Sequence, residues 1–123
     1  MGLFKPNVEK MKAKGDVEGL IKALKDNNKG VRKAAVEALG EMKWKPKNDT
    51  ETAWYLAAKG EWGELITLGK PAVGPFVQAL TDDNKDVRTA AAYALAVMKW
   101  KPKNDTETAW YLKATAELLE KIS

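Results

Sequence analysis

Hydrophobic residues recur along much of the chain at the spacing of a helix. One face of the segment 30–42 carries Val31, Ala34, Ala35, Ala38, Leu39 and Met42. The same face recurs in the segment 86–98, with Val87, Ala90, Ala91, Ala94, Leu95 and Met98. Offsets of three, four, seven and eight residues place such side chains on one side of an α-helix. Because no stretch alternates as a strand would, the pattern predicts an all-α fold.

Gly, Pro and Asp residues set the expected helix bounds. Asp16 is expected to cap the helix that starts at residue 17. Asp49 and Asp105 are the expected N-caps of the two helices that contain ETAWYL. Gly60 breaks a longer apolar segment, and Pro71 suits the first turn of the next helix. We therefore expect seven or eight helices, near residues 6–14, 17–25, 30–42, 50–59, 61–68, 72–80, 86–98 and 106–122.

An internal repeat runs through this helical pattern. The sequence MKWKPKNDTETAWYL occurs at Met42–Leu56 and again, unchanged, 56 residues later at Met98–Leu112. The helix that precedes each copy is also similar. A repeat of fixed period builds a stack of units, in which each unit covers the apolar face of its neighbour. We expect a single domain over 1–123, with repeat units near 16–69 and 72–122.

The two copies differ after the repeated sequence. Gly60 corresponds to Ala116, so the last segment can continue as one helix of about 17 residues. Two interpretations stay open for this helix. It caps the stack, or it leaves an open end that pairs with a second chain or exchanges its helix. We expect a monomer, with an end-to-end or helix-exchanged dimer as the alternative.

The composition restricts the chemistry that the chain can perform. Hydrophobic residues make up 45% and charged residues 31%, as in ordinary soluble globular proteins. The chain has no Cys and no His, and therefore lacks thiolate ligands, imidazole ligands and the commonest general base. We expect no enzyme activity, no catalytic residue, no cofactor and no metal site. The start MGLFKPNVEK lacks the apolar core of a signal peptide, and no apolar run could span a membrane. A cytoplasmic protein without a membrane partner is expected.

Positive charge is concentrated in the repeated loops. The net charge is +4, and the only arginines are Arg32 and Arg88. The loop lysines are Lys43, Lys45, Lys47, Lys99, Lys101 and Lys103. Trp44 and Trp100 lie among them. Such loops could bind an anionic polymer such as a nucleic acid, with lysines on phosphates and tryptophans stacked on bases. In the simpler interpretation the tryptophans cover the ends of the helix pairs and the lysines are solvated.

A second candidate surface comes from comparing equivalent helix positions. The outward row of the segment 30–42 is Lys33, Glu37 and Glu41, and the segment 86–98 carries Thr89, Tyr93 and Val97 there. With Ala92 and Ala96, this second row would form an apolar spot in a polar surrounding. Such spots are typical of interface anchors. The alternative is that the C-terminal helix or its loop covers the row.

Two turns of the chain share a signature. Asp26 is followed by Val31-Arg32, and Asp82 by Val87-Arg88. In this the chain resembles HEAT-like repeats of the phycobilisome-lyase family. The resemblance implies an α-solenoid of antiparallel helix pairs, an α–α superhelix. It also implies an Asp–Arg ladder between adjacent repeats, formed by Asp26, Arg32, Asp82 and Arg88. The second helices of the pairs would line a concave, partner-binding face.

These observations lead to one main expectation and two alternatives. The main expectation is a non-catalytic interaction or scaffold module that binds a protein or peptide on its concave surface. The first alternative is weak binding of an anionic polymer through the Lys-Trp loops. The second is a designed or structural scaffold without a ligand.

Overall fold

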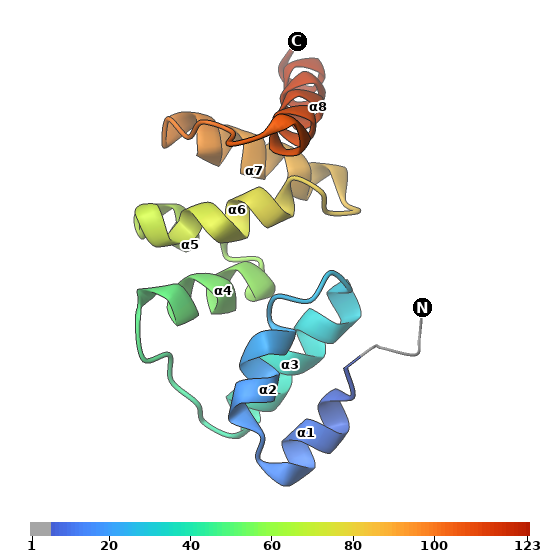
Figure 1. The fold of residues 1–123 in the computed structure, drawn as a ribbon, viewed down its shortest axis with the longest axis vertical. Helices are drawn as coiled ribbons and strands as arrows, with labels where there is room; N and C mark the ends of the chain where they lie inside the picture. Colours follow the sequence, from blue (N-terminus) through green and yellow to red (C-terminus); the bar gives the residue numbers. More distant parts are fainter. Residues whose placement is uncertain (1–5) are drawn as a thin grey trace. The chain divides into compact units, whose positions relative to one another are not determined.

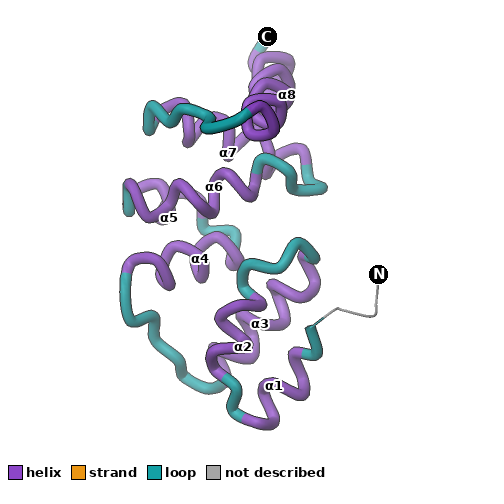
Figure 2. The backbone as a smooth tube through the Cα atoms, viewed as in Figure 1, coloured by secondary structure: helices purple, strands orange, loops and turns teal. Residues whose placement is uncertain are grey.

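The computed structural model describes residues 6–123, which form eight α-helices and a short 3₁₀ turn, with no strand in that range (Figure 1). The all-α prediction is confirmed. The helices of the first half are α1 (Val8–Lys14), α2 (Val17–Ala23), α3 (Lys29–Glu41) and α4 (Asp49–Lys59). Those of the second half are α5 (Trp62–Thr67), α6 (Val73–Ala79), α7 (Lys85–Val97) and α8 (Asp105–Ile122), with the 3₁₀ turn η2 (Lys70–Ala72) before α6. Loops of similar length follow α3 and α7 (Figure 2).

The chain divides into two compact units, with the division in the sequence between Glu61 and Trp62. The first unit contains α1 to α4, and the second contains α5 to α8. Each unit therefore holds one helix pair of the predicted type, α2 with α3 and α6 with α7, followed by a helix that begins with the repeated sequence. The expectation of one domain over the whole chain stays a prediction.

The core of the first unit lies between α1, α2 and α3. Leu20, Leu24 and Leu39 are buried there, together with the small residues Ala35 and Ala38. Burial of each leucine side chain contributes about 1.5–3 kcal/mol to folding. The alanines let the helices of the pair approach closely. The aromatic residues of α4 pack against this core from outside.

The core of the second unit is built in the same way around α6 and α7. Phe76, Leu80 and Leu95 are fully buried. Trp62 of α5 packs on Phe76 with 6.0 Å between the ring centroids. On its other side α7 contacts α8, drawn red in Figure 1. The helix α7 is thus held between its pair partner and the C-terminal helix.

Asparagine residues cap most of the helices. The prediction of Asp16 as a cap is confirmed, because its carboxylate accepts a hydrogen bond from the Gly19 amide at 2.9 Å. The prediction of Asp49 and Asp105 was wrong, because the caps of α4 and α8 are Asn48 and Asn104. Each asparagine has an extended backbone and accepts from the amide three residues ahead at 2.9 Å. The aspartates instead occupy the first helical position, where their charge favours the helix dipole.

The C-terminal ends of α4 and α8 follow the prediction. Gly60 adopts a left-handed conformation with φ 77°, and its amide closes the last turn of α4. Ala116 stands at the equivalent position of α8, and the helix continues past it to Ile122. The whole helix has 18 residues. This difference decides which part of α7 is covered, because the extra turns of α8 lie against α7.

Candidate functional site

The outward row of α7 is only partly exposed. Tyr93 is 60% exposed and Val97 54%, as predicted, and Ala96 beside them is exposed as well. Thr89 is only 1% exposed, and its hydroxyl donates to the Asp86 carbonyl at 3.1 Å. The prediction that Thr89 faces outward was therefore wrong. Ala92, which we expected in the same apolar spot, is also buried.

The ionic contacts between α7 and α8 explain why Thr89 is buried. They join the last turns of α8 to the first half of α7 through Arg88–Glu117 at 2.8 Å, Asp86–Lys121 at 3.0 Å and Lys85–Glu120 at 3.9 Å. All three partners on α8 lie beyond Ala116, in the part that has no counterpart in α4. Thr89 lies among the α7 residues that make these contacts, so the extension of α8 covers it. In the C-terminal half of α7 the outward residues Tyr93, Ala96 and Val97 remain exposed to solvent.

We define the α7 patch as Tyr93, Ala96 and Val97. The equivalent residues of α3 are Glu37, Gly40 and Glu41, all exposed, and Lys33, the equivalent of the buried Thr89, is exposed as well. Glu41 forms a salt bridge with Lys12, and the hydrogen bond that Lys12 donates to the Glu41 carboxylate raises the pKa of Lys12. One unit thus presents charged groups where the other presents an aromatic and an aliphatic side chain. The alternative that α8 or its loop covers Tyr93 and Val97 is contradicted by their exposure.

The Lys-Trp loops begin with a left-handed residue. Lys43 has φ 57° and Lys99 φ 59°. The Trp44 amide reaches back to the Leu39 carbonyl and the Lys43 amide to the Gly40 carbonyl, both at 3.0 Å. This is the hydrogen-bond pattern of the Schellman motif, in which glycine usually takes the left-handed position. The loop after α7 has the same pattern. These contacts turn the chain back so that each tryptophan meets the next helix.

Each loop tryptophan packs on a tyrosine of its own unit. Trp44 meets Tyr55, and Trp100 meets Tyr111, both edge to face with 5.2 Å between ring centroids. The Trp44 indole nitrogen is buried, so its N–H is not available to a base. These contacts favour the interpretation in which the tryptophans cover the helix ends. The remaining candidates, Lys43, Lys45, Lys99 and Lys101, are exposed. Binding of a nucleic acid to them stays a prediction.

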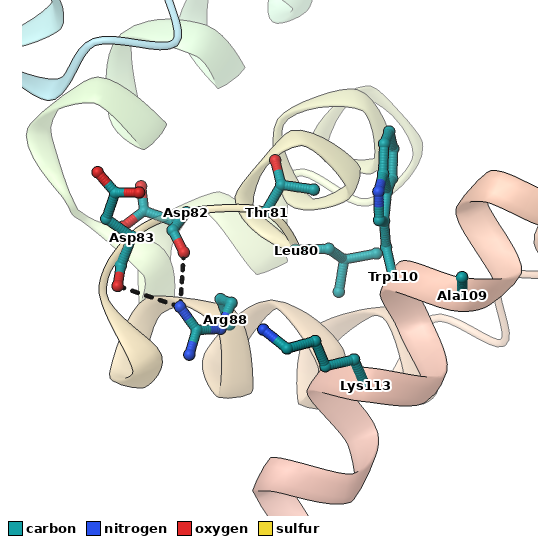
Figure 3. Close-up of a pocket in the computed structure, with 8 residues that line it drawn as sticks. All are labelled: Leu80, Thr81, Asp82, Asp83, Arg88, Ala109, Trp110 and Lys113. Atoms are coloured by element: carbon teal, nitrogen blue, oxygen red, sulfur yellow. Dashed lines mark hydrogen bonds between the residues drawn. The ribbon is translucent and has the colours of Figure 1, made fainter.

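The two arginines bind the turn inside their own repeat. Arg32 donates to the carbonyl oxygens of Asp26 and Asn27 at 2.8 and 3.1 Å. Arg88 makes the same two bonds, to the carbonyl oxygens of Asp82 and Asp83, shown as dashed lines in Figure 3.

The carboxylates of Asp26 and Asp82 hold the turn in another way. Each accepts a hydrogen bond from the amide two residues ahead, at 2.9 Å. The Asp–Val-Arg signature thus has an explanation within one repeat: the aspartate shapes the turn and the arginine ties its carbonyl oxygens to the second helix. The predicted ladder between adjacent repeats stays a prediction.

Arg88 has a further partner that the sequence analysis missed. Its Nε and Nη2 atoms donate to the two carboxylate oxygens of Glu117 at 2.9 and 2.8 Å. This hydrogen bonding lowers the pKa of Glu117 and raises that of Arg88. The pair, 29 residues apart, anchors α8 on α7. Its only sequence signal was the loss of the glycine break at position 116.

Within residues 6–123, no three acidic side chains gather in a way that could hold a metal ion. Over the same residues, no helix combines the length and the apolar character that crossing a bilayer requires.

The comparisons with known proteins agree with the helix pairs. The HEAT repeat family matches residues 17–42, which contain α2 and α3, and residues 72–98, which contain α6 and α7. These two matches support a HEAT-like repeat protein, with one matched pair in each unit. No curated protein and no solved structure matches it.

Proposed function

We propose that the chain is a non-catalytic interaction module that binds a protein or peptide through the α7 patch. HEAT repeats generally mediate protein–protein interactions, and two are present. The observation that carries the proposal is the exposure of Tyr93 and Val97, at 60% and 54%, on the second helix of its pair. The resemblance to phycobilisome-lyase-type repeats implies that this helix lines the concave face, where such proteins bind partners.

The chemistry of the patch fits an apolar anchor of a partner. Tyrosine buries a large apolar area at a small cost in conformational entropy, and its hydroxyl can still hydrogen-bond at the rim of an interface. Val97 and Ala96 would extend the apolar area along the helix by one turn. Because charged side chains stand at the same places on α3, we expect only the second unit to bind in this way.

A displayed peptide library selected on the purified chain tests this proposal. Selected peptides should bind the wild-type chain and lose at least tenfold in affinity for Tyr93→Glu and Val97→Glu, because a carboxylate would be buried in the contact. The matched control is Glu37→Gln on α3, which should bind normally. Melting curves should show all variants folded. Selected peptides that bind Tyr93→Glu and Val97→Glu as well as the wild type would contradict the proposal.

A further inference from the structure

A cleft of about 420 Å³ lies in the second unit, between the turn after α6 and the start of α8. Leu80 and Thr81 come from the end of α6 and the turn, and Asp83 from the same turn. Trp110 stands on the α8 side (Figure 3). An aromatic ring and an acidic turn thus line the same cleft. The α7 patch contributes none of its residues to it.

The first unit shows what occupies this position there. The Lys25 ammonium lies over the ring of Trp54, 5.3 Å from its centroid. Trp54 is the equivalent of Trp110, and Lys25 is the equivalent of Thr81. A cation over a tryptophan face is attracted by the negative charge of the ring. In the first unit, the chain therefore supplies its own cation to the tryptophan.

The second unit keeps the tryptophan but not the cation. Thr81 is too short to reach the ring, and its hydroxyl donates to the Gln78 carbonyl at 3.0 Å. Trp110 is 37% exposed. The turn differs in a second way, because Asp83 replaces Asn27 and adds a carboxylate. Relative to the first unit, the turn that lines the cleft thus loses one positive charge and gains one negative charge.

We propose that this cleft binds a cationic side chain, a lysine or arginine of a protein or peptide ligand. Its charged group lies over the Trp110 ring, as the Lys25 ammonium lies over the Trp54 ring in the first unit. Its aliphatic part contacts Leu80. The inference is independent of the α7 patch, because the two sites share no residue.

Two residues of the cleft oppose a cation, Arg88 and Lys113, and the guanidinium of Arg88 is paired with the Glu117 carboxylate. Lys113 lines the cleft, whereas the equivalent residue of the first unit is Ala57. Its side chain is exposed and belongs to the same face of α8 as Glu117, whose pKa it helps to lower. The charge of the Glu117 carboxylate acts on Lys113 as well as on Arg88, so Lys113 weakens cation binding without preventing it. Removal of Lys113 should strengthen binding, which gives the proposal a gain-of-affinity test.

The probes are the tripeptides acetyl-Gly-Arg-Gly-amide and acetyl-Gly-Lys-Gly-amide, with acetyl-Gly-Gln-Gly-amide as the uncharged control. Binding is followed by NMR through the indole resonances of the labelled, full-length chain, with Trp110 assigned by substitution. We expect a saturable shift of the Trp110 signal with the two cationic tripeptides and none with the glutamine tripeptide. Equal shifts with all three would overturn the proposal.

Variants taken from the first unit sharpen the test. Thr81→Lys with Asp83→Asn gives the second turn the residues of the first, and its own lysine should then cover Trp110 and abolish the shift. Trp110→Leu should weaken binding about fivefold or more, followed through the backbone amide signals of Thr81 and Asp83, which line the cleft. Lys113→Ala should strengthen it about threefold.

The controls separate the two proposals of binding. Tyr93→Glu should leave tripeptide binding unchanged, so that failure of the α7 patch and failure of the cleft are distinguishable. Circular dichroism confirms that each variant is folded. Unchanged binding by Thr81→Lys with Asp83→Asn would show that the tripeptides do not occupy the place of Lys25, and would refute the assignment.

Discussion

Arg88 and Glu117 join α7 to α8 through two parallel hydrogen bonds, Nε to Oε1 at 2.9 Å and Nη2 to Oε2 at 2.8 Å. The side chains are only 15% and 17% exposed. The remaining guanidinium nitrogen of Arg88 holds the turn after α6 through two carbonyl oxygens. One side chain thus connects the turn, the second helix of the pair and the C-terminal helix. This geometry makes the pair important for the placement of α8.

The Glu117 pair should make stability depend on acid pH. Because hydrogen bonds from Arg88 lower the pKa of Glu117 below its usual 4.5, the ionised form is favoured in the folded state. The stabilisation is complete above the ordinary pKa and is lost as the pH falls through the lowered one. Glu117→Gln should therefore melt a few degrees below the wild type at neutral pH, and the difference should shrink below about pH 4.5.

Thermal unfolding followed by circular dichroism at several pH values measures this effect. Glu120→Gln is the matched control on the same helix, because its 3.9 Å contact with Lys85 is exposed and should contribute little. A melting difference between wild type and Glu117→Gln that stays constant from neutral to acid pH would contradict the assigned role.

The contribution of the α8 cap, Asn104, to stability can be compared with that of the next residue, Asp105. Asn104→Ala removes the acceptor for the Glu107 amide and should lower the free energy of unfolding by about 1 kcal/mol. Asp105→Ala removes only a charge near the helix N-terminus and should cost less, toward the lower end of about 0.3–1 kcal/mol. Urea unfolding of both variants measures the difference. The reverse order of the two effects would favour Asp105 as the cap.

The sequence predicted the helices well and their lateral contacts poorly. Periodicity and the glycine at position 60 depend on local physics, and the segments they predicted are present. Asn48 was missed because asparagine and aspartate are about equally good caps and stand side by side here. Thr89 was misplaced because its burial depends on the crossing of α8 over α7. Contacts such as Lys25 on Trp54 join positions far apart in the chain, so no local pattern shows them.

The left-handed lysines are a source of strain that glycine should relieve. A left-handed conformation costs a residue with a Cβ about 1–2 kcal/mol. Glycine avoids this cost, but part of the gain is lost because glycine gives up more conformational freedom on folding. Lys99, at φ 59°, is such a residue. We expect Lys99→Gly to raise the free energy of unfolding by about 0.5–1 kcal/mol. Lys101→Gly, in the same loop but without a positive φ, should lower it slightly. Urea titrations of both variants measure the free energy of unfolding. A Lys99→Gly variant that is less stable than the wild type would argue against strain at this position.

The exposed loop lysines allow a direct test of polymer binding. If they bind phosphates, fluorescence anisotropy with a labelled single-stranded oligonucleotide should show an affinity that falls steeply with salt. The quadruple variant Lys43→Gln, Lys45→Gln, Lys99→Gln and Lys101→Gln should then lose binding. A variant with Lys10→Gln and Lys14→Gln on α1 controls for net charge. Affinity that is insensitive to salt, or unchanged in the quadruple variant, would rule out the loops as a polymer site.

The outer face of α8 bears on self-association. Leu112 and Leu119 are 63% and 58% exposed and stand seven residues apart, on the same side of the helix. Ile122, near the end of this face, is 70% exposed. A helix pair of this size buries less area than a stable interface needs, so we expect weak, reversible dimers visible only at high protein concentration. Sedimentation velocity over increasing concentration should show a rising mean mass for the wild type. Leu112→Glu with Leu119→Glu should remain monomeric, whereas Tyr93→Glu should associate like the wild type. A wild-type chain that stays monomeric up to about 1 mM would leave this face without a partner of its own kind.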